Sequence, residues 1–351
     1  MGVSRALARR VLGPLAAMAA MAAMVAFGAA APAPGGGPGN YGTRPQVRQF
    51  IAEMVDRHGF VQRDLRKLFS RARYQPAILR AMSPPPGAPQ KSWQNYRALF
   101  VNRARIAAGT HFRERHGAAL ARAAQQFGVP AQIVVAILGV ETVYGLNMGT
   151  HRVLDALSTL AFDFPRRSEF FRSELENFLL YARENSIDTL AAQGSYAGAF
   201  GIPQFMPGSY RRFAIDYDGD GRRDLHSSPE DAIGSVANYL HAHGWRAGQP
   251  IAERAQVRGN AFRPLIEAGI LPAYRIADLP AYGVVLATGG ADATALPPEA
   301  GCALIELETP GQPPEYWVGL KNFYVLTRYN RSSFYAIAVI ELARAIAAQA
   351  P

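Results

Sequence analysis

The stretch VPAQIVVAILGVETVYGLNMG, residues 129–149, decides the fold of the chain and contains its most unusual residue. Its first half is almost wholly apolar, and Pro130 stands where the first turn of a helix tolerates proline. We therefore expect a buried helix over residues 131–145. Glu141 lies inside this apolar segment, so the first question is why a carboxylate is placed there.

Helical spacing puts Glu141 on an apolar face. Residues three and four apart share one side of a helix, so Val134 and either Ile137 or Leu138 lie in line with Glu141. Burial without a partner disfavours a charged carboxylate and raises its pKa, and a Glu protonated near neutral pH can act as a general acid. The alternative is a structural Glu, paired with Arg or backbone donors or facing solvent at a helix end.

A second unusual segment, GSYAGAFGIPQFMP (194–207), mixes glycines with aromatic residues. Glycine lets the backbone approach a ligand closely, and aromatic faces such as that of Phe205 stack on sugars or bases. We expect a structured loop in which Ser195 and Gln204 supply orienting hydrogen bonds. The alternative is a tight turn packed on the core.

The segment DYDGDGRRDL, residues 216–225, resembles the first half of an EF-hand calcium loop. Its predicted ligands occupy loop positions 1, 3, 5, 7 (through the carbonyl) and 9, and they are Asp216, Asp218, Asp220, Arg222 and Asp224. Position 12 is Ser227 rather than Glu, so either Glu230 or Asp231 would have to supply the last ligand. The alternative is an acidic surface turn. Calcium bound here would be structural.

The N-terminus has the organisation of a secretory signal peptide. Three Arg residues precede an uncharged apolar run and the small-residue stretch AAAPAP, so we expect cleavage near Ala29–Ala31. The alternative is a retained anchor helix. No Cys lies near this junction, so no lipid anchor is expected there, and the single Cys302 should be a small buried residue.

The net charge of +10 favours anionic partners in general, but the basic residues form no stripe, so nucleic acid is disfavoured. Apolar spacing and Gly/Pro breaks predict a mainly α (α+β) protein with a helical N-terminal domain and a small β-rich insertion. The predicted segments are a signal peptide (1–30), a flexible lead-in (31–45), a helical N-terminal domain (46–130), a catalytic core (131–250) with an EF-hand-like loop (216–231), a β-rich subdomain (251–320) and a C-terminal strand/helix returning to the core (321–351).

Several segments in this order resemble the B-type membrane-bound lytic murein transglycosylases: GVETVYG, LSTLAFDFPRR, GSYAGAFGIPQFMPGSY, DYDGDGRRDL and DAIGSVANYLHAHGW. The resemblance runs from about residue 45 to the C-terminus. It implies a lysozyme-like helical core and cleavage of the MurNAc–GlcNAc β-1,4 bond of peptidoglycan with formation of a 1,6-anhydro-MurNAc end. It also implies Glu141 as the catalytic acid and base, and Asp231 as the late calcium ligand. The substrate-binding residues implied or expected beside it are Tyr96, Ser195, Gln204, Phe205, Tyr239, Tyr329 and Asn330.

Glycosidases that retain configuration ordinarily use two carboxylates, whereas one suffices if no water attacks. The hypothesis is therefore that Glu141 acts first as acid and then as base. The alternatives are a hydrolytic muramidase with Asp155 or Asp163 as second acid, and a non-catalytic, calcium-stabilised peptidoglycan-binding protein. We expect a periplasmic monomer that binds glycan strands, with proteins of cell-wall synthesis or remodelling as candidate partners.

Overall fold

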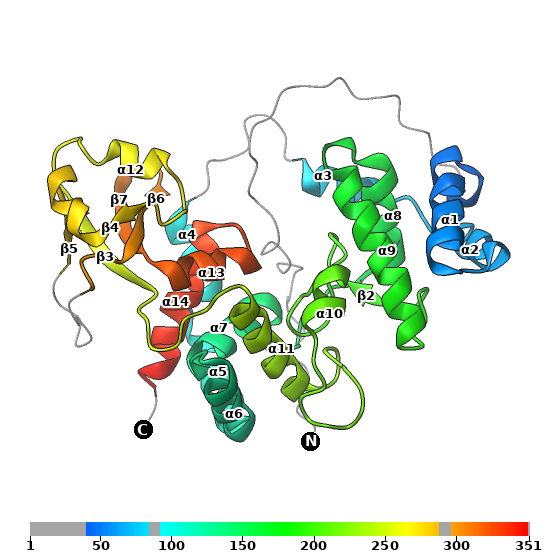
Figure 1. The fold of residues 1–351 in the computed structure, drawn as a ribbon, viewed down its shortest axis with the longest axis horizontal. Coiled ribbons are helices and arrows are strands. Elements are labelled where there is room, and N and C mark those ends of the chain that lie inside the picture. The colour runs from blue at the N-terminus through cyan, green and yellow to red at the C-terminus, as the bar shows by residue number, and fades with distance from the viewer. Residues whose placement is uncertain (1–39, 84–91, 288–295, 350–351) are drawn as a thin grey trace, which may run out of the picture.

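The computed structural model describes residues 40–83, 92–287 and 296–349, and most of these are helical, with a five-stranded sheet at the edge of the molecule (Figure 1). A second, two-stranded sheet pairs β1 (His151–Arg152) with β2 (Gln193–Gly194). The mainly α expectation is thereby confirmed. The predicted signal peptide lies outside the described residues. In the described part, no single helix is long and apolar enough to span a membrane. The helices α6 (Gly117–Phe127) and α7 (Ala131–Thr142) reach that length and composition only as a pair, which is bent by 114°.

The first three helices of the chain, α1 to α3, lie beside α8 and α9 and not beside α4 to α7, which come next in the sequence (Figure 1). The bounds are η1 Tyr41–Thr43, α1 Pro45–His58, α2 Gln62–Phe69, α3 Pro76–Met82, α8 Val153–Asp163, η2 Pro165–Arg167 and α9 Ser168–Glu184. Their apolar faces bury Phe50, Phe69 and Phe171, each at most 1% exposed. This group of helices forms one end of the molecule.

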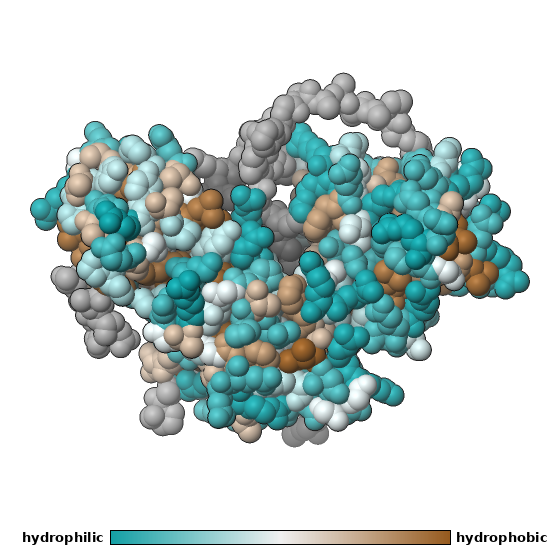
Figure 2. Space-filling model, viewed as in Figure 1, coloured by the Kyte–Doolittle hydropathy of each residue, from teal (hydrophilic) through white to brown (hydrophobic). Residues whose placement is uncertain are grey.

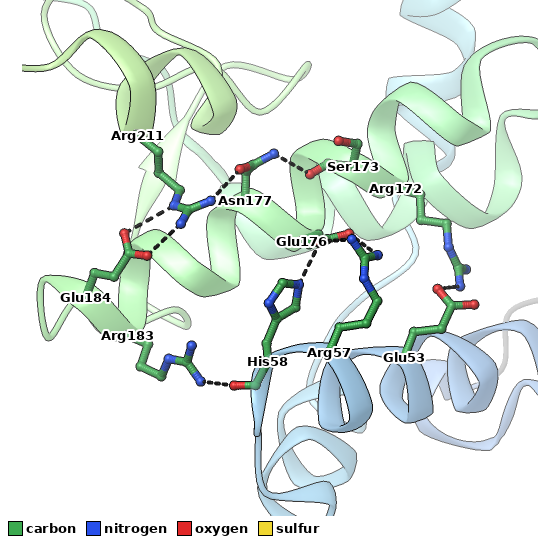
Figure 3. Close-up of polar contacts among 10 residues, drawn as sticks. All are labelled: Glu53, Arg57, His58, Arg172, Ser173, Glu176, Asn177, Arg183, Glu184 and Arg211. Carbon is green, nitrogen blue, oxygen red and sulfur yellow. Dashed lines mark hydrogen bonds and ion pairs between the residues drawn. The ribbon is translucent and has the colours of Figure 1, made fainter.

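Charged side chains fasten α1 to α9 around that apolar contact (Figure 3). Arg172 donates to Glu53 at 2.7 Å, and the His58 ring nitrogen lies 2.8 Å from Glu176. Arg183 donates to the backbone carbonyl of His58 at 2.7 Å. Because these partners are more than 100 residues apart in the chain, the contact is a purely tertiary one.

The centre of the molecule is built around α7, whose residues from Ile133 to Val140 are all buried. Helices α5, α6, α11 and α14 surround it. The bounds of the central helices are α4 Trp93–Phe100, α5 Arg103–Arg115, α6 Gly117–Phe127, α7 Ala131–Thr142, α10 Pro207–Phe213, α11 Pro229–Ala242, α13 Lys321–Tyr329 and α14 Ser333–Ala347. The face drawn in Figure 2 is mostly hydrophilic, as expected when the apolar residues are used in this core.

The β-rich subdomain has an antiparallel sheet in the order β4-β6-β7-β3-β5. The bounds are β3 Ala252–Val257, α12 Arg263–Glu267, β4 Tyr274–Arg275, η3 Ile276–Tyr282, β5 Val284–Leu286, β6 Gly301–Thr309 and β7 Gln312–Gly319. It has a small core of its own, which includes Phe262, Leu265 and Val318. Cys302 belongs to that core and is fully buried, as expected for an unpaired thiol.

Two expectations differ from the structure. The lead-in predicted as flexible, residues 31–45, is ordered from residue 40 on, because Tyr41 is fully buried and its hydroxyl donates to Asp163 at 2.5 Å. The C-terminal segment predicted as strand/helix is instead two helices, α13 and α14, among the described residues. The strand β7 ends at Gly319, and the following residues bury Phe323, Val325 and Leu326 at helical spacing.

Candidate functional site

The site is built where α7 ends. The helix stops at Thr142 rather than continuing to residue 145, because Val143 and Tyr144 take left-handed backbone conformations. The Thr142 hydroxyl donates to the carbonyl of Ile202 at 2.7 Å and accepts the N–H of Gly145 at 2.9 Å. Glu141 therefore occupies the last turn of a buried helix, beside the loop that contains Ile202.

Glu141 is partly buried and has one charge-stabilising partner among its described contacts, the hydroxyl of Tyr335. That hydroxyl donates to Glu141 Oε1 at 2.7 Å. Desolvation by burial raises the pKa of Glu141 from 4.5 to about 8, and the hydrogen bond from Tyr335 opposes this shift without cancelling it. The carboxyl group is thus mostly protonated at neutral pH, as the sequence pattern predicted.

Aromatic side chains from four helices and from the Gly/aromatic loop gather near this carboxyl group. Tyr329 stacks on Tyr335 with ring centroids 6.3 Å apart and an angle of 11° between the rings. Tyr239 lies 5.0 Å from Tyr329, and Phe205 lies 5.8 Å from the same ring. Burial, with the Glu141 carboxylate as a further cause, raises the pKa of Tyr96 and of Tyr329, so these hydroxyl groups stay protonated.

Most of these aromatic residues also make contacts that stabilise the fold. The Tyr329 hydroxyl donates to the carbonyl of Pro203 at 2.6 Å, and that of Tyr239 donates to the carbonyl of Arg328 at 2.7 Å. Phe205 is 2% exposed and serves as packing beneath the two tyrosines. The hydrogen bonds fix α13 to α11 and to the Gly/aromatic loop, so the aromatic cluster is a rigid surface.

The Gly/aromatic loop places its two predicted polar residues differently. Ser195 is buried, and its Oγ accepts the N–H of Ala199 at 3.1 Å, which closes the turn. Gln204 has a positive φ of 50°, and its amide nitrogen donates to the carbonyls of Met148 and Gly201. The amide oxygen of Gln204 is then the atom left to accept a hydrogen bond from a ligand. A role in binding sugar stays a prediction for both residues.

Asn330 ends α13 and joins it to α14. Its backbone N–H donates to Leu326, and its carbonyl accepts the N–H of Ser332, which in turn caps α14. This short connection brings Tyr329 and Tyr335 together on adjacent helices. The contact of Asn330 with a substrate stays a prediction.

Sequence reasoning missed Tyr335, whose hydroxyl donates a hydrogen bond to Glu141. The signal available was weak: apart from Tyr335 and Glu341 the buried residues of α14 are apolar, and Tyr335 is fully buried there with a hydroxyl that needs a partner. Because that partner lies 194 positions earlier in the chain, periodicity cannot identify it.

The two acids considered as a second catalytic carboxylate have other partners. Asp155 accepts hydrogen bonds from the Arg152 side chain and from the backbone N–H of Arg73. Asp163 pairs with Arg44 at 2.7 Å and also accepts the Tyr41 hydroxyl. Both acids sit on α8 and fasten it to the N-terminal helices, and no described contact joins either of them to Glu141.

The acidic loop folds into a cage of backbone turns. Asp216 accepts the N–H groups of Gly219 and Gly221, as in tight calcium-binding loops. Asp231 is fully buried at the start of α11, and its two oxygens accept N–H groups of Tyr217, Asp218 and Asp224. Burial raises the pKa of Asp231, while these N–H groups oppose the shift.

Three of the predicted ligands converge. One oxygen each from Asp216, Asp218 and Asp231 lies within 4.8 Å of the other two, which matches oxygens on one Ca²⁺ at about 2.4 Å. Asp220 and Asp224 are outside this group: Asp220 accepts the N–H of Arg222, and Asp224 accepts those of residues 226 and 227. The donor set of carboxylate oxygens fits a hard cation, whereas ligation by Asp220, Asp224 and the Arg222 carbonyl stays a prediction.

Known proteins resemble this chain over most of its length. Residues 42–344 match the family model described as transglycosylase SLT domain. Membrane-bound lytic murein transglycosylase B of Escherichia coli strain K12 is 42% identical over 317 residues, which are 88% of this chain and 84% of that protein. Both Glu141 and the acidic loop lie within the matched residues.

Solved structures show the same similarity in three dimensions. The soluble lytic transglycosylase SltB1 of Pseudomonas aeruginosa has a TM-score of 0.79 and 45% identity, with 87% of this chain and 99% of that chain covered. The E. coli lytic transglycosylase Slt35, solved in complex with calcium, has a TM-score of 0.76 and 41% identity, with 89% and 95% covered. The likeness therefore extends from sequence to fold across the three parts of the molecule.

Proposed function

The chain belongs to the transglycosylase SLT domain family, and on this premise we propose that it is a lytic transglycosylase of peptidoglycan in which Glu141 is the only catalytic carboxyl group. The predicted lysozyme-like helical core is confirmed by the solved relatives. The observation that carries the catalytic assignment is the partly buried Glu141, with a pKa of about 8 and a hydrogen bond from Tyr335.

In the first step, protonated Glu141 gives its proton to the glycosidic oxygen between MurNAc and GlcNAc. The bond from C1 to that oxygen breaks, the GlcNAc side leaves with a new hydroxyl group, and the acetamido oxygen of the MurNAc stabilises the positive charge at C1. Glu141 is now a carboxylate, and the Tyr335 hydroxyl stabilises that form.

In the second step, the Glu141 carboxylate removes the proton from the C6 hydroxyl of the same MurNAc. Oxygen O6 then bonds to C1 and closes the 1,6-anhydro ring, and Glu141 is protonated again for the next cycle. No water enters the product, so no second carboxylate is needed to activate one. This agrees with the engagement of Asp155 and Asp163 in ion pairs elsewhere.

The aromatic cluster supports a binding site for sugar rings. We infer that Tyr96, Tyr239 and Tyr329 form its apolar surface and that Phe205 supports it from beneath, with Gln204, Ser195 and Asn330 supplying polar contacts. Rigid rings held by backbone hydrogen bonds lose little entropy when a ligand stacks on them.

Mass spectrometry of muropeptides released from purified sacculi tests the proposal. The expected products end in 1,6-anhydro-MurNAc. Products heavier by one water, with a free reducing end, would show hydrolysis and favour a muramidase. Binding to sacculi without any release would favour a non-catalytic wall-binding protein.

We further propose that the acidic loop binds one structural Ca²⁺ through Asp216, Asp218 and Asp231. The convergence of three carboxylate oxygens supports this, as does the calcium complex of the related Slt35. The ion would neutralise three neighbouring negative charges and fix the start of α11, the helix that carries Tyr239.

The remaining proposals concern location. We propose a periplasmic protein whose N-terminal segment is a signal peptide, which fits a peptidoglycan substrate and relatives described as membrane-bound or soluble lytic transglycosylases. N-terminal sequencing of the protein purified from the periplasm tests this: a start near residue 30 is expected, and a start at residue 1 would show a retained segment.

A further inference from the structure

The backbone directly after Glu141 is held in an unfavourable conformation. Val143 and Tyr144 have φ angles of 52° and 59°, the left-handed region that residues other than glycine seldom occupy. Two such residues in succession persist only where the surroundings fix them, and strain of this kind gathers at functional sites. The contacts of Tyr144 show what fixes this turn.

Tyr144 enters a slot between α5 and α7 that two glycines keep open. A Cβ atom on Gly109 or on Gly139 would lie 2.4 Å from the Tyr144 hydroxyl oxygen, so neither position accepts a side chain without a shift. The ring stacks on Phe112 at 5.2 Å, and the hydroxyl donates to the carbonyl of Arg105 at 3.3 Å. The turn after Glu141 is thereby pinned to α5.

Arg105 supplies a second link between the same two helices. Its guanidinium donates to the carbonyl of Gly139 and reaches that of Val140 at 3.5 Å. Both carbonyls belong to the last turn of α7, where helices commonly lack some of their own donors, although the Gly139 carbonyl also accepts the N–H of Val143 at 3.2 Å. The guanidinium is half-buried, lies over the ring of Phe100 at 5.2 Å, and burial lowers its pKa. The Arg105 guanidinium is thus partly removed from water at the position from which it contacts these two carbonyls.

We propose that Arg105 and Tyr144, seated against Gly109 and Gly139, form an α5–α7 clamp that positions the Glu141 carboxyl group for proton transfer. The clamp acts through the backbone of residues 139–144, and neither side chain contacts Glu141 itself in the described interactions. Arg105 and Tyr144 are therefore positioning residues. The inference rests on the proposed role of Glu141, and it adds Arg105 and Gly109, which lie on α5 outside the motif around Glu141.

The test compares Arg105→Met with Arg113→Met. Both residues lie on α5, and the Arg113 guanidinium also donates to a backbone carbonyl, that of Ile346 at 3.3 Å, but not to α7. Turnover of soluble glycan strands and the melting temperature are measured for each variant. Arg105→Met should lower kcat about 10- to 100-fold with KM within about twofold, as expected when a catalytic group is displaced by a fraction of an ångström to 1 Å. Arg113→Met should keep both constants.

Two conservative variants extend the comparison. Arg105→Lys should regain part of kcat, because an ammonium group can still donate to one of the carbonyls. Tyr144→Phe keeps the stacked ring and removes only the bond to the Arg105 carbonyl, so it should fold and show a smaller loss of kcat in the same direction. If Arg105→Met does not fold, Tyr144→Phe carries the test.

A titration of the Glu141 carboxyl carbon by NMR provides a readout that needs no turnover. Loosening the turn lets water reach the carboxyl group, so the midpoint should fall from about 8 toward 4.5 in Arg105→Met and stay in place in Arg113→Met. Unchanged kcat and midpoint in Arg105→Met, with a melting temperature lowered as in Arg113→Met, would overturn the clamp. Absence of anhydro product from the wild-type protein would overturn the proposed function instead, while the titration still decides about the clamp.

Discussion

At the scale of the residue, Glu141 has an environment that serves a proton donor and a proton acceptor in turn. Desolvation favours the neutral form, and the Tyr335 hydroxyl favours the carboxylate. The first effect is larger, so the resting state is the acid. Because of the second effect, the carboxylate formed after proton transfer is stabilised by a hydrogen bond from Tyr335.

The raised pKa of Glu141 predicts the pH dependence of activity and of stability. The value of kcat/KM should fall above about pH 8, with the slope of a single ionisation, because the acid form is lost. Stability should also fall as the pH rises from about 4.5 to about 8, since the unfolded chain releases this proton near 4.5 and the folded one near 8. Glu141→Gln removes both effects and should abolish turnover.

The measurements are a pH–rate profile and denaturant unfolding at several pH values. The gain in unfolding free energy of Glu141→Gln over the wild type should be largest near pH 9 and shrink toward pH 5. Release of anhydro products by Glu141→Gln at a wild-type rate would contradict the assignment.

A separate prediction concerns Tyr335, because its hydrogen bond lowers the pKa of Glu141. Tyr335→Phe should move the alkaline limb of the rate profile to higher pH and lower kcat about 10- to 100-fold, since the carboxylate loses its only hydroxyl donor among the described contacts. Tyr274→Phe, in the β-rich subdomain, is the matched control. A Tyr335→Phe profile identical to the wild type would show that this hydrogen bond has no part in the reaction.

At the scale of the element, the acidic loop and α11 act as one unit. Ser228 caps the helix by accepting the N–H of Asp231, and its hydroxyl donates to Asp218 at 2.7 Å. The loop thereby ties the predicted ligands to the first turn of α11. Tyr239 lies further along that helix. The position of the aromatic cluster therefore depends, through α11, on the conformation of the loop.

Calcium should raise the thermal stability of the protein. A ligand present at about one hundred times its Kd adds roughly 2.7 kcal/mol to the free energy of unfolding. Chelation should lower the melting temperature accordingly, and Asp218→Asn should reduce the response to calcium. Asp56→Asn, an exposed change on α1, keeps the net charge of the variants equal and should respond like the wild type. An equal calcium response in both variants would rule out this loop as the site.

At the scale of the whole molecule, α8 joins the N-terminal helices to the core. Its Asp163 pairs with Arg44, and the two side chains are 6% and 8% exposed. Its Asp155 holds Arg152 and the backbone of Arg73. These contacts join segments that are far apart in the sequence. Removing one should therefore lower the free energy of unfolding and leave the rate of the reaction unchanged.

Asp163→Asn separates the structural role of this acid from a catalytic one. It breaks the nearly buried ion pair with Arg44 and should lower the free energy of unfolding by about 3 kcal/mol. At low temperature, where the variant is folded, kcat should stay within about twofold of the wild type. Tyr41→Phe removes the hydroxyl that donates to the same acid and that also lies 3.4 Å from the Thr159 hydroxyl, and it should cost about 1 kcal/mol. Loss of turnover in folded Asp163→Asn would instead indicate a second catalytic acid.

The sequence by itself determined the local features of this protein. An apolar run with one acid predicted a buried helix and a raised pKa for Glu141, because an acid in line with apolar residues of its own helix is turned toward the core. Likewise the spacing of Asp216 and Asp218 predicted a turn that gathers oxygens, and β6 and β7 followed from a strand pattern. Each of these depends on interactions within about fifteen residues.

Only the tertiary structure decided what meets Glu141 and what holds it. Tyr335 and Arg105 reach the end of α7 from other helices, and the left-handed turn at Tyr144 exists because Gly109 and Gly139 leave a slot for its ring. The convergence of Asp231 with Asp216 also depends on how α11 docks. Such contacts leave no periodic trace, because a single side chain that fills a space between distant segments obeys the geometry of packing rather than the order of the chain.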